Sequence, residues 1–144
     1  MTQNQLIGVW KLVTSEFKDD EGNRTEFYGT KATGLLIYTE QGYFSAHLNL
    51  PNPPDPAEQF AVFLGPLTDE QKSYLKPLAN YVSYGGRYEL QPDKVINYGD
   101  FFSNPTVSGA QPRFFEFKDN RLILSGAFTF PTKTIRFYVI WEKA

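Results

Sequence analysis

The chain has 144 residues, a formal net charge of −2 and no cysteine. This length corresponds to about one domain, so we expect a single domain over residues 1–144. The lack of cysteine excludes disulfide bonds, a thiol nucleophile and cysteine-ligated metals. The small charge offers no electrostatic footprint for nucleic acid or an anionic membrane. The aromatic content of 17% favours strands, because Phe and Tyr suit pleated, half-buried surfaces.

Short extended segments separated by turns run through most of the chain. Residues 10–18 alternate with the period of a strand, although both faces are mixed. Residues 33–39 and 43–49 flank a short loop that ends in Gly42, which predicts a hairpin with this glycine in the left-handed conformation. Further strands are predicted at residues 86–90, 95–100, 113–118, 121–125 and 134–142. Many short strands at near-regular spacing indicate an all-β sandwich or barrel.

One segment departs from the strand pattern. Residues 50–56 are rich in proline, which cannot occupy a central strand because it removes a ladder donor. Thr68 and Gln71 then have the spacing of a capping box, and apolar residues recur at helical spacing as far as Val82. Pro77 would kink this helix. The pattern predicts a short amphipathic helix between two strands, packed against a barrel or across its mouth.

Four blocks of sequence resemble a known family. Gly8-Val9-Trp10 has the Gly-x-Trp signature that opens lipocalin-type barrels. Residues 34–45, 81–89 and 113–142 resemble the second and third strands, the helix-to-strand junction and the closing strands of the bacterial and fungal lipocalin-like family. The resemblance covers nearly the whole chain. It implies an antiparallel up-and-down β-barrel of about eight to nine strands around a pocket.

The resemblance also bears on individual residues. In such barrels the early Trp closes one end, often against an arginine from a late strand, and here Arg113 or Arg136 could serve. Some relatives carry a histidine in the strand that matches residues 95–100, where this chain has Asn97-Tyr98. Any chemistry of that histidine therefore does not carry over.

The expected function is binding of a small hydrophobic or aromatic metabolite inside the barrel. The alternative is a cofactor-free isomerase or cyclase acting on a polyketide- or terpenoid-like substrate, as in natural-product biosynthesis. Such an enzyme needs only a shaped pocket and one positioned acid or base, so it leaves no sharp motif. A third possibility is a structural barrel filled by its own side chains.

Candidate site residues follow from residue type and strand position. His47, the only histidine, is the first candidate for acid–base work near neutral pH, against the alternative of a surface or structural histidine. Charges within aromatic-rich strands must be paired or meet an anionic ligand group. Tyrosines offer an apolar ring and one hydroxyl. The candidate catalytic residues are His47, Tyr98, Asp100 and Arg113. The candidate ligand-binding residues are Tyr38, Tyr43, Ser45, Tyr84, Tyr88, Arg136 and Tyr138.

No cofactor is expected. The chain has one histidine, and its carboxylates do not have the spacing of a metal-binding loop. Haem ligation by His47 is the alternative. No nucleophile-elbow or phosphate-loop motif is present. The polar N-terminus lacks the features of a signal peptide, so we expect a cytoplasmic protein that does not enter the membrane. An apolar patch after the proline-rich segment predicts either a lid over the cavity or a homodimer contact; it comprises Phe60, Val62, Phe63, Leu64 and Leu67.

Overall fold

The computed structural model describes residues 4–22, 24–25, 31–51, 67–78, 80–103, 107–129 and 134–144. Its elements in chain order are β1 (Gly8–Lys18), β2 (Arg24–Thr25), β3 (Thr33–Tyr38), β4 (Tyr43–Asn49), α2 (Asp69–Leu78), β5 (Tyr81–Leu90), β6 (Lys94–Gly99), β7 (Phe101–Phe102), β8 (Gly109–Lys118), β9 (Arg121–Thr129) and β10 (Thr134–Lys143). Every described strand pairing is antiparallel.

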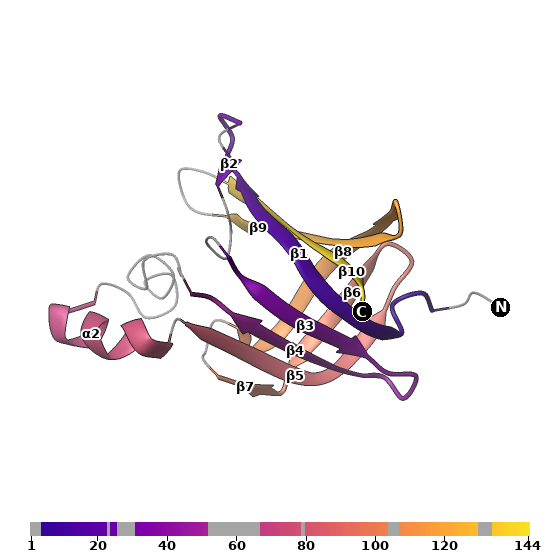
Figure 1. The fold of residues 1–144 in the computed structure, drawn as a ribbon, viewed down its shortest axis with the longest axis horizontal. Coiled ribbons are helices and arrows are strands. Elements are labelled where there is room, and N and C mark those ends of the chain that lie inside the picture. Colours follow the sequence, from indigo (N-terminus) through magenta and orange to yellow (C-terminus); the bar gives the residue numbers. More distant parts are fainter. Residues whose placement is uncertain are drawn as a thin grey trace.

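The strands form a closed barrel (Figure 1). Hydrogen bonds run in the order β10-β9-β8-β6-β5-β4-β3-β1, and β10 pairs again with β1 to close the ring. Two short strands lie outside this ring among the described residues. β2 pairs with the C-terminal end of β1, and β7 pairs with β5. The predicted all-β antiparallel barrel is therefore confirmed. Closure removes the exposed sheet edges that an aromatic-rich sheet would otherwise present.

The local turn and cap predictions are also confirmed. Gly42 has φ of 90°, as the predicted hairpin requires. Thr68 and Gln71 form the capping box, with Thr68 N donating to Gln71 Oε1 at 2.9 Å and Gln71 N to Thr68 Oγ1 at 3.2 Å.

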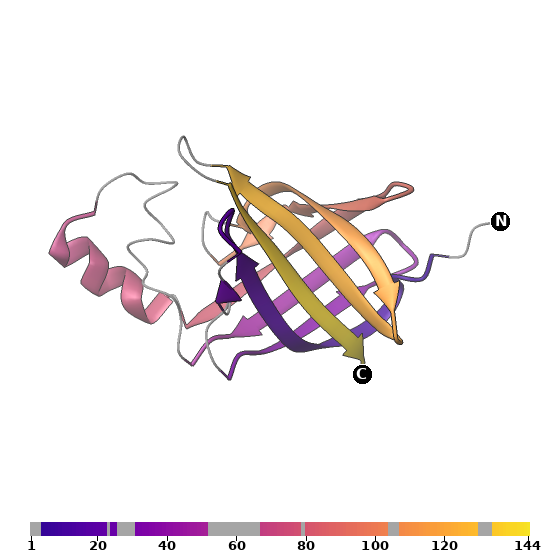
Figure 2. The same cartoon turned by 90° about the horizontal axis from the view of Figure 1, so that it is seen from above.

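The helix prediction needs two corrections. The helix ends at Leu78, and Tyr81 and Val82, which continue its apolar period, begin β5 instead. Tyr81 and Val82 are extended because they pair with Asn49 and Leu48 on β4. Hydrogen bonding and packing with a neighbouring strand override the local helical spacing of apolar residues. The helix also neither packs along the barrel wall nor covers its mouth: α2 lies beyond the end of the barrel, and residues 69–74 are exposed (Figures 1 and 2). It is too short and too polar to cross a membrane, and it is the only described helix.

One face of every barrel strand points inward to the core. The alternation is clearest in β4, where Phe44, Ala46 and Leu48 are buried, and in β10, where Phe137, Val139 and Trp141 are buried. A register shift between Leu12 and Thr14 changes the parity of β1, so that Ser15 becomes buried opposite Val139. This bulge explains the mixed faces of the β1 sequence.

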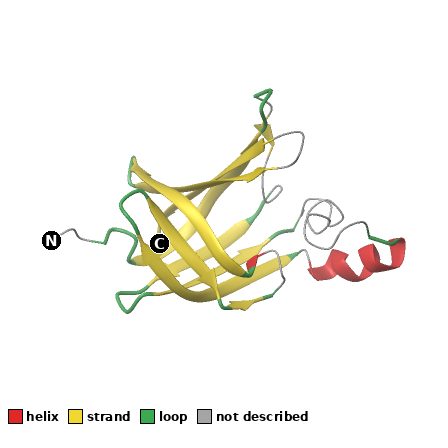
Figure 3. Ribbon diagram, turned by 180° about the vertical axis from the view of Figure 1, so that it is seen from behind, coloured by secondary structure: helices red, strands yellow, loops and turns green. Residues whose placement is uncertain are grey.

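The N-terminal segment lies at one end of the barrel (Figure 3). Side chains close this end. Trp10 is 3% exposed, and its indole N–H donates to the Leu6 carbonyl at 2.8 Å. The cation over its ring is Lys143, whose Nζ lies 4.3 Å from the ring centroid and donates to the Ile7 carbonyl. The arginine expected at this place is thus replaced by a lysine: Arg113 lies elsewhere inside the barrel, over Phe137, and Arg136 is exposed.

Candidate functional site

The inner wall of the barrel carries a group of polar side chains. Strand register identifies its members, because residues directly opposite in an antiparallel pair share a face of the sheet. Arg113 lies opposite the fully buried Val95, Gln111 opposite Asn97, and Tyr84 opposite Ala46. We call Tyr38, Tyr84, Asn97, Gln111 and Arg113 the interior polar group.

Arg113 is the charged member of this group and is half-buried. Its guanidinium carbon lies 4.7 Å from the centroid of the Phe137 ring, two strands away on β10. Gly126, on the strand between them, makes this contact possible, because a Cβ there would come within 2.6 Å of the Phe137 ring. The guanidinium donates to Gln111 Oε1 at 3.1 Å and to the Pro112 carbonyl at 2.8 Å.

These acceptors of Arg113 are neutral. Among the described residues, no carboxylate forms an ion pair with Arg113. A partly desolvated cation without a counter-charge is unfavourable unless another anion satisfies it.

Tyr84 lies near Arg113 with its hydroxyl uncommitted. Its ring packs edge-on against Phe44, with centroids 5.5 Å apart, and its hydroxyl has no hydrogen-bond partner among the described residues. Burial raises the pKa of the Tyr84 phenol above its usual range, and the positive charge of Arg113 offsets part of that rise. Tyr84 therefore stays protonated at neutral pH and can donate a hydrogen bond.

Tyr38 and Tyr88 also face the barrel interior, and they use their hydroxyls within the protein. Tyr38 is 1% exposed, and its hydroxyl donates to Asn97 Oδ1 at 3.1 Å. Burial raises the pKa of Tyr38 well above its usual range. The Tyr88 hydroxyl donates to the Thr39 carbonyl at 2.7 Å and accepts from Asn4 Nδ2. The two rings meet edge-on at 4.9 Å, so they pack together in the barrel interior.

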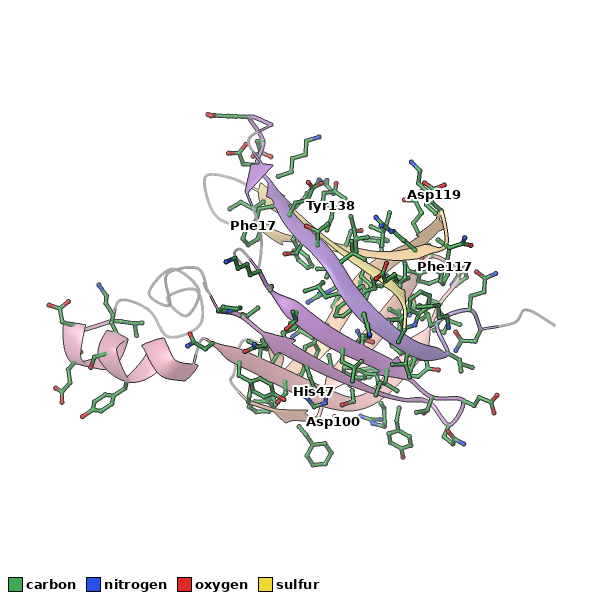
Figure 4. The ribbon with its side chains drawn as sticks, viewed as in Figure 1. Phe17, His47, Asp100, Phe117, Asp119 and Tyr138 are labelled. Atoms are coloured by element: carbon green, nitrogen blue, oxygen red, sulfur yellow. The ribbon has the colours of Figure 1, made fainter. Side chains whose placement is uncertain are left out.

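The remaining candidate residues lie on the outside of the barrel. Tyr43, Ser45 and His47 alternate with the buried residues of β4 and therefore face outward. His47 bridges two hydroxyls, with Nε2 2.9 Å from Ser45 Oγ and Nδ1 2.7 Å from Tyr81 Oη. Figure 4 shows His47 and Asp100 on the same wall of the barrel.

Asp100 and Tyr98 belong to a charged cluster on this outer surface. Asp100 Oδ2 lies 3.3 Å from Arg87 Nε, and the Tyr98 hydroxyl donates to Glu89 Oε2 at 3.1 Å. The bond to Arg87 lowers the pKa of Asp100, and the bond to Glu89 raises the pKa of Tyr98. Asp100 is thus already paired with a cation, and the Tyr98 hydroxyl is already used in a hydrogen bond.

Arg136 and Tyr138 share the outer face of β10, as their spacing predicts. Arg136 is exposed and Tyr138 half-buried, and both alternate with buried residues. Figure 4 places Tyr138 on a different part of the barrel from His47 and Asp100. The eleven candidates therefore do not form one site: Tyr38, Tyr84, Tyr88 and Arg113 lie inside, and the other seven lie outside.

Two surface hollows accompany these groups. One of about 410 Å³ lies at the closed end, beside Trp10, Phe117 and Asp119. Figure 4 labels Phe117 and Asp119. The other, of about 520 Å³, lies on the outer wall over β4, β5 and β7, and includes Ser45 and His47. Among the described residues, no three His, Asp or Glu side chains are grouped so as to hold a metal ion. The predicted lid or dimer patch lies outside the described residues except for Leu67, which is half-buried.

Sequence reasoning missed Gln111 and Asn97 as interior polar residues. Strand parity places Asn97 on the face of Val95 and Gln111 on the face of Arg113, and the closed barrel shows that this face points inward. Lys143 over Trp10 was also not expected, because the family resemblance implies an arginine at this place.

Comparison with known proteins supports one family. The profile of the lipocalin-like domain matches residues 7–144, which is nearly the whole chain. A search of curated proteins finds no match. A closed antiparallel barrel with Gly8-Val9-Trp10 at its closed end agrees with the profile match. The chain belongs to the lipocalin-like domain family.

Proposed function

We propose that the barrel binds a small hydrophobic or aromatic metabolite that carries an anionic oxygen, such as a carboxylate, phenolate or enolate. The proposal rests on the environment of Arg113. This residue is a half-buried cation inside the barrel and forms no ion pair with a described carboxylate. An anionic ligand group would supply the missing counter-charge through charge-assisted hydrogen bonds.

The surroundings of Arg113 favour an aromatic ligand body. Phe137, Phe44 and Tyr84 bring ring faces and edges to the inner wall. The Tyr84 hydroxyl offers a second donor near the cation, and Gln111 adds an amide. Small-molecule sites commonly combine apolar walls with a few such convergent polar groups.

A pair of arginine variants tests this proposal. The probes are 8-anilinonaphthalene-1-sulfonate, an aromatic anion, and N-phenyl-1-naphthylamine, its uncharged counterpart. Arg113→Met should weaken binding of the anionic probe by at least about tenfold, because a hydrogen bond to a charged group contributes about 1.5–3 kcal/mol. Binding of the uncharged probe should change by less than about threefold.

Arg136→Met is the matched control, since it removes an arginine from the outer face of β10. It should leave both dissociation constants unchanged. Equal affinity of wild type and Arg113→Met for the anionic probe would refute the proposal.

A second candidate function is the cofactor-free isomerase or cyclase. The observation in its favour is the pairing of a protonated phenol, Tyr84, with the cation of Arg113. This arrangement can stabilise an enolate oxygen and deliver a proton to it. Tyr84→Phe separates the functions: a binding protein keeps its ligand affinity within a few-fold, whereas an enzyme loses turnover of bound substrate while still binding it.

A further inference from the structure

The outer wall carries a hydrogen-bonded chain of serine, histidine and tyrosine. Ser45 Oγ lies 2.9 Å from His47 Nε2, and His47 Nδ1 lies 2.7 Å from Tyr81 Oη. A nucleophile within reach of a base, itself oriented by a third group, is the arrangement that activates hydroxyls in proteins.

The sheet register explains why these three side chains meet. Ser45 and His47 are two residues apart on β4 and share its outer face. His47 pairs with Ser83 on β5, so Tyr81 is its diagonal neighbour and its long side chain reaches the imidazole. Both ring nitrogens of His47 are therefore held by neighbouring hydroxyls.

A groove gives a small molecule access to Ser45. The hollow of about 520 Å³ includes Ser45 and His47, and Phe101 and Phe102 on β7 supply apolar surface. Gly85 lies directly opposite Ser45 in the sheet and has no side chain to cover the serine hydroxyl. Phe101 is 78% exposed, so this aromatic surface lies open to solvent.

We propose that Ser45 is an activated nucleophile that accepts the acyl group of small aryl esters bound in this groove. In the tautomer with its proton on Nδ1, His47 donates to Tyr81 Oη and accepts the Ser45 proton at Nε2. Ser45 Oγ bonds to the ester carbonyl carbon, and the bond from that carbon to the aryloxy oxygen breaks. His47 returns the proton to the aryloxide. Water then attacks the acyl-serine, with His47 again taking and returning the proton, and releases the acid.

Ser83 adds a hydrogen-bond donor to the groove. It lies opposite His47, lines the same hollow, and its hydroxyl has no hydrogen-bond partner among the described residues. The hydroxyl is available to the carbonyl oxygen as that oxygen gains negative charge. Tyr81 acts as a positioning residue through His47.

The test is incubation of the full chain with p-nitrophenyl acetate, followed by intact mass and peptide mapping. The wild type should release one burst equivalent of p-nitrophenol per chain and carry the acetyl group on Ser45. Ser45→Ala should abolish this label, and His47→Gln should slow labelling by about 100-fold or more, the usual contribution of a general base. Ser73→Ala removes a helix serine that donates to the Glu70 carbonyl, and should label like wild type.

His47 is the only histidine, so its imidazole nitrogen resonances report the site without ambiguity. Tyr81→Phe should shift the Nδ1 resonance and slow labelling about tenfold, whereas a purely structural Tyr81 would leave the tautomer unchanged. Acetylation that persists in Ser45→Ala, or that never reaches Ser45 in the wild type, overturns the proposal. Ser45→Ala should bind the anionic naphthalene probe with the affinity of wild type, which shows that the barrel is folded. The acylation test of Ser45 is therefore independent of the ligand-binding test of Arg113.

Discussion

Arg113→Met is expected to make the protein more stable while it weakens ligand binding. The substitution removes a half-buried cation that has only neutral acceptors, Gln111 Oε1 and the Pro112 carbonyl, and a stacking contact with Phe137. Those contacts contribute about 1–2 kcal/mol together. Replacing a buried ion pair by apolar groups of similar volume is commonly neutral or stabilising by about 1–4 kcal/mol, and Arg113 lacks even the counter-charge of such a pair among the described residues.

The balance predicts a gain near 1 kcal/mol in the free energy of unfolding, because Arg113 is only partly desolvated. For a chain of this size that gain corresponds to a rise in Tm of about 3–4 °C. Thermal unfolding followed by circular dichroism, without ligand, measures it. Arg136→Met, at an exposed position, should stay within about 0.5 kcal/mol of wild type. A fall in Tm of more than about 4 °C for Arg113→Met would contradict this reasoning. It would show that Arg113 stabilises the folded barrel without a ligand.

Two further predictions concern the closed end and the interior. Lys143→Met removes the cation over Trp10 and should lower Tm by about 3 °C, a loss near 1 kcal/mol, whereas the exposed Lys118→Met should change Tm by less than 1–2 °C. Thermal unfolding of both variants checks this, and equal effects would contradict the closing role of Lys143. Tyr38→Phe leaves the buried Asn97 oxygen unpaired and should cost about 1–3 kcal/mol at pH 7. Because the folded pKa of Tyr38 is raised above its unfolded value near 10, its stabilisation is complete below about pH 10 and declines as the pH rises further. Urea denaturation should therefore show a smaller gap between wild type and Tyr38→Phe at about pH 11 than at pH 7, and an unchanged gap would contradict the raised pKa.

Strand positions were predictable because each strand has its own local signal. The alternation of residues 43–49 predicts β4 with its exact bounds, and Gly42 predicts the turn before it. Strand ends were less accurate: β5, β8 and β9 extend beyond the segments with clear alternation. In β8 the extension includes Pro112, whose pairing with Ile96 is set by neighbouring strands rather than by propensity.

The division of the candidate site into inner and outer residues was not predictable from single strands. Strand parity places His47 and Phe44 on opposite faces of β4. Only the closed barrel determines which of these two faces points inward. The contact of Arg113 with Phe137 depends on Gly126 on a third strand, and the chain of Ser45, His47 and Tyr81 depends on the β4–β5 register. These arrangements involve residues far apart in sequence, which no local pattern specifies.

The position of a bound aromatic anion tests the central claim most directly. A crystal structure of the protein with 8-anilinonaphthalene-1-sulfonate would locate the sulfonate. Our account predicts that the naphthalene ring lies inside the barrel against Phe137 and Tyr84, with a sulfonate oxygen within hydrogen-bond distance of the Arg113 guanidinium. A probe bound only on the outer wall, with Arg113 still bonded only to Gln111 and the Pro112 carbonyl, would contradict this claim.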